Sequence, residues 1–273
     1  MEDKDQQTQA KAAEGNDWPA SAEGKPAETA VDRLRLVMGD EALARIQASR
    51  VMVIGLGGVG SNCAEALARG GVGSLVLLDR DVVAPSNINR QAVAWQSTVG
   101  QVKAEVMERL VRNINPDCEV TSVQAFLSRE NLVETLNSLP RPDFVVDAID
   151  TMTQKLLIAQ WCQDQRLPLI SSMGGANKLD PTRLRFGDIE DTREDRLARV
   201  MRKQCRKRGI HGLEVLWSDE HPRQPQGKQD ALREGGFVRE GASILGTMSY
   251  MPPIMGQMIA GRVISRLAGL PWE

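Results

Sequence analysis

The chain has 273 residues, 41% of them hydrophobic, which is enough apolar sequence for a folded core. Its formal net charge of −2 excludes a polyanion-binding surface over the whole molecule, so any contact with a nucleic acid would need a local basic patch. The four cysteines form no CxxC pair and only two histidines are present, so we expect no zinc site, no disulfide framework and no His-rich metal centre.

Residues 1–30 form a polar tail that lacks the apolar stretch of a signal peptide, so we expect a disordered tail and a cytoplasmic protein. From residue 50 onward, β-rich runs alternate with single helical stretches. This alternation predicts an α/β fold with a mostly parallel, doubly wound, Rossmann-like sheet and a C-terminal extension. We predict strands at 51–54, 74–78, 119–123, 144–147, 168–172, 183–186 and 214–217, and helices at 61–69, 103–113, 129–136, 152–164, 193–208 and 254–267.

Two segments after residue 218 need separate treatment. Residues 219–240 are polar and predict a mobile loop. Residues 242–261 carry no charge, which raises the question of a membrane span. Pro252 and Pro253 in the middle of that segment favour a buried strand or loop followed by a helix, so no stable span is expected, although membrane contact of the segment is left open.

A glycine-rich segment, GLGGVG at 55–60, lies between a predicted strand and a predicted helix. This is the context that a dinucleotide-binding loop requires, because backbone N–H groups and the helix dipole then face phosphate oxygens. Asp79, at the end of the next strand, can accept hydrogen bonds from ribose hydroxyls. Since NAD and ATP share that ribose, these residues do not distinguish the two nucleotides. The glycines are Gly55, Gly57, Gly58 and Gly60.

Two cations follow the ribose carboxylate: Arg90 in an SNINRQ segment and Lys103 in a GQVK segment. A dehydrogenase keeps its pyrophosphate intact and needs no such pair, whereas an adenylating enzyme must stabilise the negative charge that grows on departing pyrophosphate. Asp150 follows a strand at the edge where open sheets bind ligands, and its carboxylate can hold Mg²⁺ against the phosphates. Either cation alone would indicate an ordinary surface charge, but together with Asp150 they favour ATP-dependent adenylation.

Five stretches carry a family resemblance: GLGGVGS at 55–61, LLDRDVV at 77–83, SNINRQ at 86–91, VGQVKAEV at 99–106 and DAID at 147–150. Through them the chain resembles the ubiquitin-activating-enzyme-like adenylyltransferases, the ThiF/MoeB/HesA group. The resemblance implies a homodimer in which Arg33, before the first strand, reaches into the ATP site of the partner subunit. It also implies that ATP and Mg²⁺ are bound by Asp79, Asn87, Arg90, Lys103 and Asp150.

The second half lacks the two CxxC pairs of the zinc-binding sulfur-carrier activators and is similar instead to the tRNA threonylcarbamoyladenosine dehydratases. That similarity implies adenylation of a threonyl carboxylate on a modified tRNA adenosine, followed by ring closure through an acyl-adenylate. We therefore expect one adenylating domain at 31–273, with nucleotide binding in 31–173 and substrate binding and dimer formation in 174–273. The similar stretches are SMGGANKLDPTRLRFGDI at 172–189, RLARVMRKQCRKRGI at 196–210 and GTMSYMPPIMGQMIAGRVI at 246–264.

The predicted helix at 193–208 carries eight Lys or Arg residues against two acids. Such a charge run is usually a solvated helix face, but a basic stripe also suits salt-sensitive contacts with RNA phosphates. The resemblance favours RNA contact and hence tRNA as a partner. The cations that recur on one helical face are Arg196, Arg199, Lys203 and Arg206.

Cys205 bears on the competing hypotheses. Cations surround it in the sequence and would lower its pKa, and ubiquitin-type activators use a cysteine in the second half as an acyl acceptor. Ring closure within a tRNA substrate needs no enzyme thiol, so we interpret Cys205 as incidental. The alternative function is an adenylating activator of a ubiquitin-like or sulfur-carrier protein, which requires such a cysteine. A third hypothesis is a non-enzymatic nucleotide-binding scaffold in a sulfur-transfer complex, with a cysteine desulfurase or its sulfur acceptor as partner.

Overall fold

A computed structural model of the chain describes residues 28–224 and 245–271 and contains one seven-stranded sheet. Its strands are β1 (Arg50–Ile54), β2 (Ser74–Asp79), β3 (Glu119–Gln124), β4 (Phe144–Asp147), β5 (Leu169–Ser172), β6 (Leu184–Asp188) and β7 (Glu214–Ser218). The strand order is β3-β2-β1-β4-β5-β7-β6, and only β6 runs antiparallel to its neighbour. The predicted mostly parallel, Rossmann-like sheet is confirmed.

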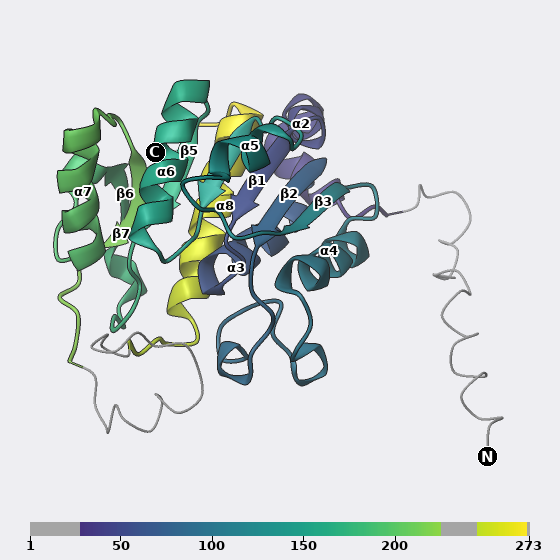
Figure 1. The fold of residues 1–273 in the computed structure, drawn as a ribbon. Helices are drawn as coiled ribbons and strands as arrows, with labels where there is room; N and C mark the ends of the chain where they lie inside the picture. Colours follow the sequence, from purple (N-terminus) through teal and green to yellow (C-terminus); the bar gives the residue numbers. More distant parts are fainter. Residues whose placement is uncertain (1–27, 225–244, 272–273) are drawn as a thin grey trace, which may run out of the picture.

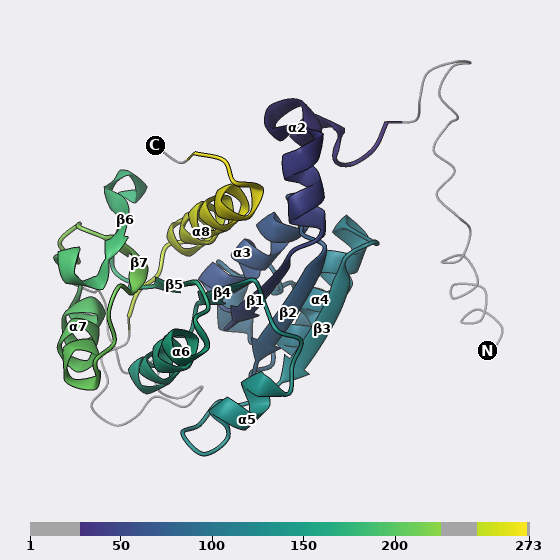
Figure 2. The same ribbon diagram turned by 90° about the horizontal axis from the view of Figure 1, so that it is seen from above.

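Helices cover both faces of the sheet (Figure 1 and Figure 2). Strand residues alternate between the two layers: Val51 and Val53 of β1 pack on one layer, and Met52 and Ile54 on the other. Burial on both faces explains why the central strands are continuous apolar runs. The first layer contains α2 (Asp32–Gln47), α3 (Gly58–Arg69), α4 (Lys103–Ile114) and α8 (Met251–Ala268), and the second contains α5 (Leu132–Asn137), α6 (Met152–Gln165) and α7 (Arg196–Arg208).

Two helices, α7 and α8, begin at other residues than predicted, because local features of their first turns determine where they start. Helix α7 begins at Arg196 rather than at residue 193, because Asp195 Oδ1 accepts a hydrogen bond from Ala198 N (2.9 Å) and so caps the helix. Helix α8 begins at Met251, ahead of the predicted start at 254, with two prolines in its first turn. Proline is tolerated there because its missing N–H would have no partner within the helix.

Helix α2 has no counterpart among the predicted elements. A kink at Gly39, whose φ of 78° lies in the left-handed region, interrupts its apolar pattern. Near its end, Arg45 Nε donates to Ala268 O of α8 (3.0 Å), and Ile46 O accepts from Gly73 N just before β2 (3.2 Å). These contacts place the end of α2 at the amino-terminal edge of the sheet.

The remaining predictions concern segments that the structure describes only in part. The predicted tail at 1–30 lies outside the described residues up to residue 27, and the predicted mobile loop at 219–240 lies outside them from residue 225 onward. The apolar segment at 242–261 is described from residue 245, where a loop leads into α8. Within the described ranges, no helix combines the length and the apolar character that crossing a bilayer requires.

Helices α3 and α8 pack closely because a glycine stands where they meet. Gly256 of α8 is buried, and a Cβ atom there would lie 2.4 Å from Val59 O and 2.9 Å from Cys63 N of α3. Gly58, the first residue of α3, is similarly close to α8, since a Cβ atom there would lie 2.7 Å from Pro252 Cβ. The start of α8 is thereby held beside the glycine-rich loop.

Gly256→Ala tests this packing, because helix propensity and packing predict effects of opposite sign. Alanine is favoured over glycine in a helix interior by about 1 kcal/mol. We expect the contact with the α3 backbone to outweigh that gain and to lower the free energy of unfolding by about 1–3 kcal/mol in urea titrations. Gln257→Ala, at an exposed position of the same helix, is the control and should change stability by less than about 0.5 kcal/mol. An unchanged or higher stability of Gly256→Ala would contradict the close packing.

Candidate active site

The strand order reverses between β1 and β4, since β2 and β3 lie on one side of this pair and β5 lies on the other. Ligands of open α/β sheets bind beyond the carboxyl ends of the strands at such a point. A cavity of about 750 Å³ lies there, and the loops that follow β1, β2, β4 and β5 contribute to its wall. The first residues of α7 and α8 complete the wall from the second half of the chain.

The cavity collects most of the predicted site residues. Gly60 does not line it: a Cβ atom at Gly60 would lie only 1.7 Å from Gly55 O, so this glycine allows the loop to close tightly. Arg33 does not line it either, because it is exposed on α2, the helix that ends at the opposite edge of the sheet. The predicted residues in the wall are Gly55, Gly57, Gly58, Asp79, Asn87, Arg90, Lys103 and Asp150, together with Arg196 from the predicted RNA-binding stripe.

The predicted ribose ligand, Asp79, is fixed by backbone hydrogen bonds. Its Oδ2 accepts from Leu56 N (2.5 Å) and its Oδ1 accepts from Asp81 N (2.7 Å). Burial raises the pKa of Asp79, while the Lys103 ammonium and these hydrogen bonds act in the opposite direction. Lys103 is only 5% exposed and donates to Asp81 Oδ2 (3.2 Å). A cation kept at such low exposure in a cavity wall is suited to pairing with a bound anion.

Arg90 lies over the start of α3, where the stem of its side chain approaches Gly58. Its guanidinium donates to Ser86 O (3.1 Å) and to Asn89 Oδ1 (2.7 Å), which orients the group. Burial lowers the pKa of Arg90, and the negative charge of Asp150 opposes that shift. Arg90, predicted to bind phosphate, and Asp150, predicted to hold the metal ion, are therefore close enough to interact electrostatically.

Gln91, the neighbour of Arg90, was not among the predicted site residues. It is 7% exposed and lines the cavity, and its Oε1 has no hydrogen-bond partner among the residues that the structure describes. A buried unpaired acceptor costs about 1–3 kcal/mol, so a ligand that donates a hydrogen bond here would remove that cost. Asn87, by contrast, is oriented already, because its Oδ1 accepts from Ala84 N (3.0 Å). Only the position of Gln91 next to Arg90 in the SNINRQ segment hinted at a role.

A fully buried ion pair lies behind the loop that carries Asp150. Lys155 Nζ is 3.1 Å from Asp147 Oδ2, and both side chains have 0% exposure. Ser171 Oγ donates to the same carboxylate oxygen (2.6 Å), and Asp147 Oδ1 accepts from Ile149 N (3.1 Å). The pair thereby holds the backbone next to Asp150. The sequence did not indicate this contact, because it joins two strands and a helix.

The donor set around Asp150 fits Mg²⁺ better than zinc. Asp150 is exposed in the cavity wall, and Thr151 Oγ1 donates to its Oδ1 (3.2 Å). In the described part of the chain, no group of three or more His, Cys, Asp or Glu side chains could hold a metal ion. One carboxylate suffices for Mg²⁺ when phosphate oxygens and water complete its octahedral shell, whereas structural zinc needs four protein ligands.

The prediction that neighbouring cations lower the pKa of Cys205 is wrong. Cys205 has 0% exposure on the inner face of α7, where it packs with Ala198 and Met201. Burial raises the pKa of its thiol to about 11, and the opposing effect of Arg208 is smaller. Most cations of α7 are exposed while the thiol is buried, because the helix separates its polar and apolar faces. An unreactive thiol agrees with an incidental role for Cys205.

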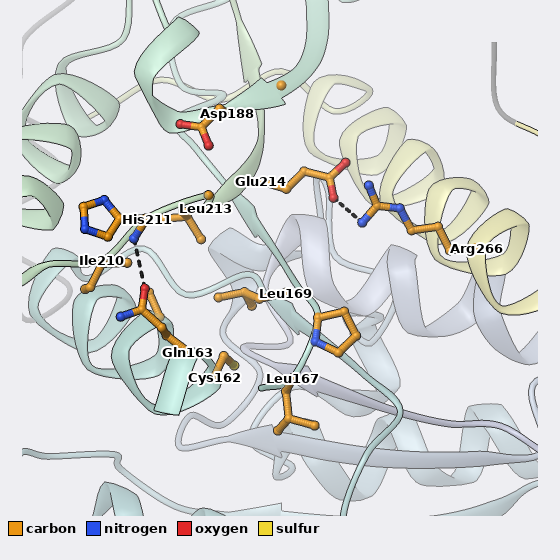
Figure 3. Close-up of a pocket in the computed structure, with 14 residues that line it drawn as sticks. Cys162, Gln163, Leu167, Leu169, Asp188, Ile210, His211, Leu213, Glu214 and Arg266 are labelled. Carbon is orange, nitrogen blue, oxygen red and sulfur yellow. Dashed lines mark hydrogen bonds and ion pairs between the residues drawn. The ribbon is translucent and has the colours of Figure 1, made fainter. Parts of the chain in front are cut away.

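A second cavity of about 440 Å³ lies at the opposite edge of the sheet, beside the first residues of β5 and β7 (Figure 3). Several of its polar groups are paired with other groups of the protein. The Glu214 carboxylate forms an ion pair with Arg266 (2.5 Å), and Gln163 Oε1 accepts from His211 N (2.9 Å). None of the predicted site residues lines this cavity. We therefore assign the candidate active site to the first cavity.

Comparison with known proteins agrees with this geometry, since residues 31–272 match the ThiF family. The chain belongs to the ThiF family. It is 40% identical over 240 residues to the tRNA threonylcarbamoyladenosine dehydratase of Bacillus subtilis (strain 168), covering 86% of this chain and 93% of that protein. The crystal structure of the E. coli tRNA N6-threonylcarbamoyladenosine dehydratase, TcdA, is similar with a TM-score of 0.75 at 30% identity, covering 88% of this chain and 94% of that one. Its complex with ATP is similar with a TM-score of 0.73 at 29% identity, covering 89% and 98%.

The burial of all four cysteines predicts a native protein without rapidly reacting thiols. Ellman's reagent should detect no fast reaction at mildly alkaline pH, and all four thiols after unfolding in guanidinium chloride. Cys205 should react only after unfolding, because burial keeps the reagent from its thiol and raises the pKa of that thiol to about 11. A fast native reaction that disappears in Cys205→Ala would contradict the burial of this thiol.

Proposed function

We propose that the protein is an ATP-dependent tRNA threonylcarbamoyladenosine dehydratase. It adenylates the threonyl carboxylate of the modified adenosine and then closes that side chain into the cyclic form, with net loss of water. One observation carries the proposal: Arg90, Lys103 and Asp150 line one cavity with the glycine-rich loop in a ThiF-family chain. The dehydratases to which the chain is similar match it over most of its length, and the E. coli enzyme has been crystallised with ATP.

The phosphates and the ribose of the nucleotide have complementary groups in the cavity wall. Backbone N–H groups of the glycine-rich loop and the positive end of the α3 dipole favour phosphate oxygens. Asp79 accepts hydrogen bonds from the ribose. Arg90 and Lys103 stabilise the charge that develops on the departing pyrophosphate. Asp150 would hold Mg²⁺, which neutralises phosphate charge when it is bound.

The reaction needs positioning more than acid–base catalysis. The threonyl carboxylate is ionised at neutral pH, so its oxygen can attack the α-phosphorus without a general base. The bond from the α-phosphorus to pyrophosphate breaks, and an acyl-adenylate forms. A nucleophilic atom of the carbamoyl-adenosine arm then attacks the acyl carbon, AMP leaves and a proton is released. No enzyme thiol takes part, in agreement with the burial of Cys205.

The same proposal assigns a function to each of the two parts of the chain. Residues 31–173 bind the nucleotide, and 174–273 bind the substrate and contribute to a homodimer. The exposure of Arg33 at a distance from its own cavity supports a role in the partner subunit's site. Because tRNA and ATP occur together in the cytoplasm, we place the protein there. A cysteine desulfurase or sulfur acceptor as a further partner stays a prediction from the sequence.

The basic face of α7 supports tRNA as the partner. The helix buries Ala198, Met201 and Cys205 and presents the predicted stripe of Arg196, Arg199, Lys203 and Arg206 to solvent. Arg206 differs from the other cations, because its guanidinium forms two contacts with the carboxylate of Glu190, one of them from Nε at 2.9 Å. Phosphate would have to compete with that carboxylate. We therefore expect RNA phosphates to bind mainly along Arg196, Arg199 and Lys203.

Mass spectrometry of the nucleoside tests the proposal directly. After incubation of the protein with ATP, Mg²⁺ and threonylcarbamoyl-modified tRNA, the modified nucleoside should be lighter by one water. Arg90→Ala should slow this conversion by about 10²–10³-fold, the usual effect of removing one group that stabilises transition-state charge. Arg112→Ala is the control, since Arg112 pairs with Glu108 on the surface of α4 and should not affect the rate.

An unchanged nucleoside mass would contradict the proposed substrate. ATP–pyrophosphate exchange that instead depends on a ubiquitin-like or sulfur-carrier protein would support the alternative activity. If Arg90→Ala converted the modified nucleoside at the wild-type rate, that result would contradict the assignment of this cavity as the active site.

A further inference from the structure

Among the described residues after residue 173, Arg196 is the one charged side chain in the wall of the active-site cavity. The other lining residues from this part are small, apolar or uncharged: Gly174, Gly175, Ala176, Leu197, Leu245, Thr247, Pro252 and Met255. Arg196 therefore brings a positive charge to the cavity from the part of the chain proposed to bind the substrate. The cations proposed to act on the phosphates, Arg90 and Lys103, come from the other part.

The backbone of Arg196 is held firmly next to the cavity. Asp195 Oδ2 accepts from Gly174 N (2.9 Å), while Oδ1 caps α7. The buried ammonium of Lys178 donates to Glu194 O (3.3 Å) and to Ser218 O (2.6 Å). These bonds join the start of α7 to the loop after β5 and to the end of β7. The backbone position from which the Arg196 side chain extends is therefore fixed in the cavity wall.

Arg196 differs from the other cations of the cavity, because it has no partner among the residues that the structure describes. Lys103 donates to Asp81, Arg80 Nε also donates to Asp81 (3.2 Å), and Arg90 donates to Asn89. Within the described residues, Arg196 forms no hydrogen bond and no ion pair. No described side chain competes with an incoming anion for its guanidinium.

The proposed reaction requires such a group. An ionised carboxylate must approach an α-phosphate that is itself negatively charged, and the two repel each other in a cavity of low dielectric constant. A guanidinium binds a carboxylate through two parallel hydrogen bonds and so fixes both its position and its orientation. We propose that Arg196 binds the threonyl carboxylate of the modified adenosine before adenylation. This inference rests on the proposed function and assigns the residue that recognises the reacting group.

A carboxylate-binding role separates Arg196 from the rest of the α7 stripe. Arg199 and Lys203 are exposed but do not line the cavity, so they can reach RNA phosphates and not the reacting nucleoside. Arg199 therefore provides a matched control one helical turn away. Both arginines would contribute to tRNA affinity, but only Arg196 would distinguish tRNA that carries the carboxylate from tRNA that lacks it.

A binding cycle with two tRNAs measures this difference. The dissociation constants of tRNA with threonylcarbamoyladenosine and of the same tRNA with unmodified adenosine are measured with a non-hydrolysable ATP analogue, which prevents turnover. Wild type should bind the modified tRNA about tenfold or more tightly, the usual effect of a charge-assisted hydrogen bond. Arg196→Ala should abolish that preference, and it should weaken the binding of unmodified tRNA by no more than Arg199→Ala does. Arg196→Lys should retain part of the preference, because lysine keeps the charge but loses the planar fork.

Arg199→Ala should weaken the binding of both tRNAs by the same factor, and added salt should reduce the difference from wild type. Circular dichroism checks that each variant is folded. The inference is overturned if wild type shows no preference for the modified tRNA, or if Arg196→Ala weakens both tRNAs equally. Failure of the proposed function is recognised separately, because the wild-type protein would then bind the modified tRNA without ever removing water from it.

Discussion

The site depends on matching the negative charge of a triphosphate with groups that are fixed before it binds. Lys103 is almost fully buried beside the carboxylate of Asp81, and Arg90 is partly desolvated near Asp150, so a bound anion would stabilise both cations further. The glycine-rich loop adds backbone donors at the start of α3, in the wall of the same cavity. A polyanion that enters here gains attraction without reorganising the protein, and this is the arrangement that stabilises a departing pyrophosphate.

The rest of the fold holds these groups in place through contacts that bury polar atoms or bring backbones close together. The ion pair of Lys155 with Asp147 supports the loop of Asp150 from behind. Gly256 lets α8 approach α3, which places the start of α8 in the cavity wall. Asp195 places the start of α7 in the same wall, because its carboxylate accepts hydrogen bonds from Gly174 N and Ala198 N. Nucleotide-facing and substrate-facing groups therefore belong to one continuous sheet and its helices, and their distances are set by packing.

The local sequence was sufficient to predict a strand or a site residue where the residue type itself indicates the role. The central strands could be predicted because burial on both faces produces unbroken apolar runs, and Asp79, Arg90, Lys103 and Asp150 could be placed together because they follow parallel strands. Long-range contacts were not predictable. The partners of Lys155 lie on two separate strands, the unpaired oxygen of Gln91 is visible only in the folded cavity, and the pKa of Cys205 follows from burial that its basic neighbours conceal. Helix α2 was missed because Gly39 interrupts its pattern.

A crystal structure of the protein with ATP and Mg²⁺ tests the central claim most directly. We expect the guanidinium of Arg90 and the ammonium of Lys103 within about 3 Å of phosphate oxygens, and a carboxylate oxygen of Asp150 bound to the metal ion. A nucleotide bound elsewhere, or bound in this cavity with those three side chains turned away from its phosphates, would contradict adenylation at this site.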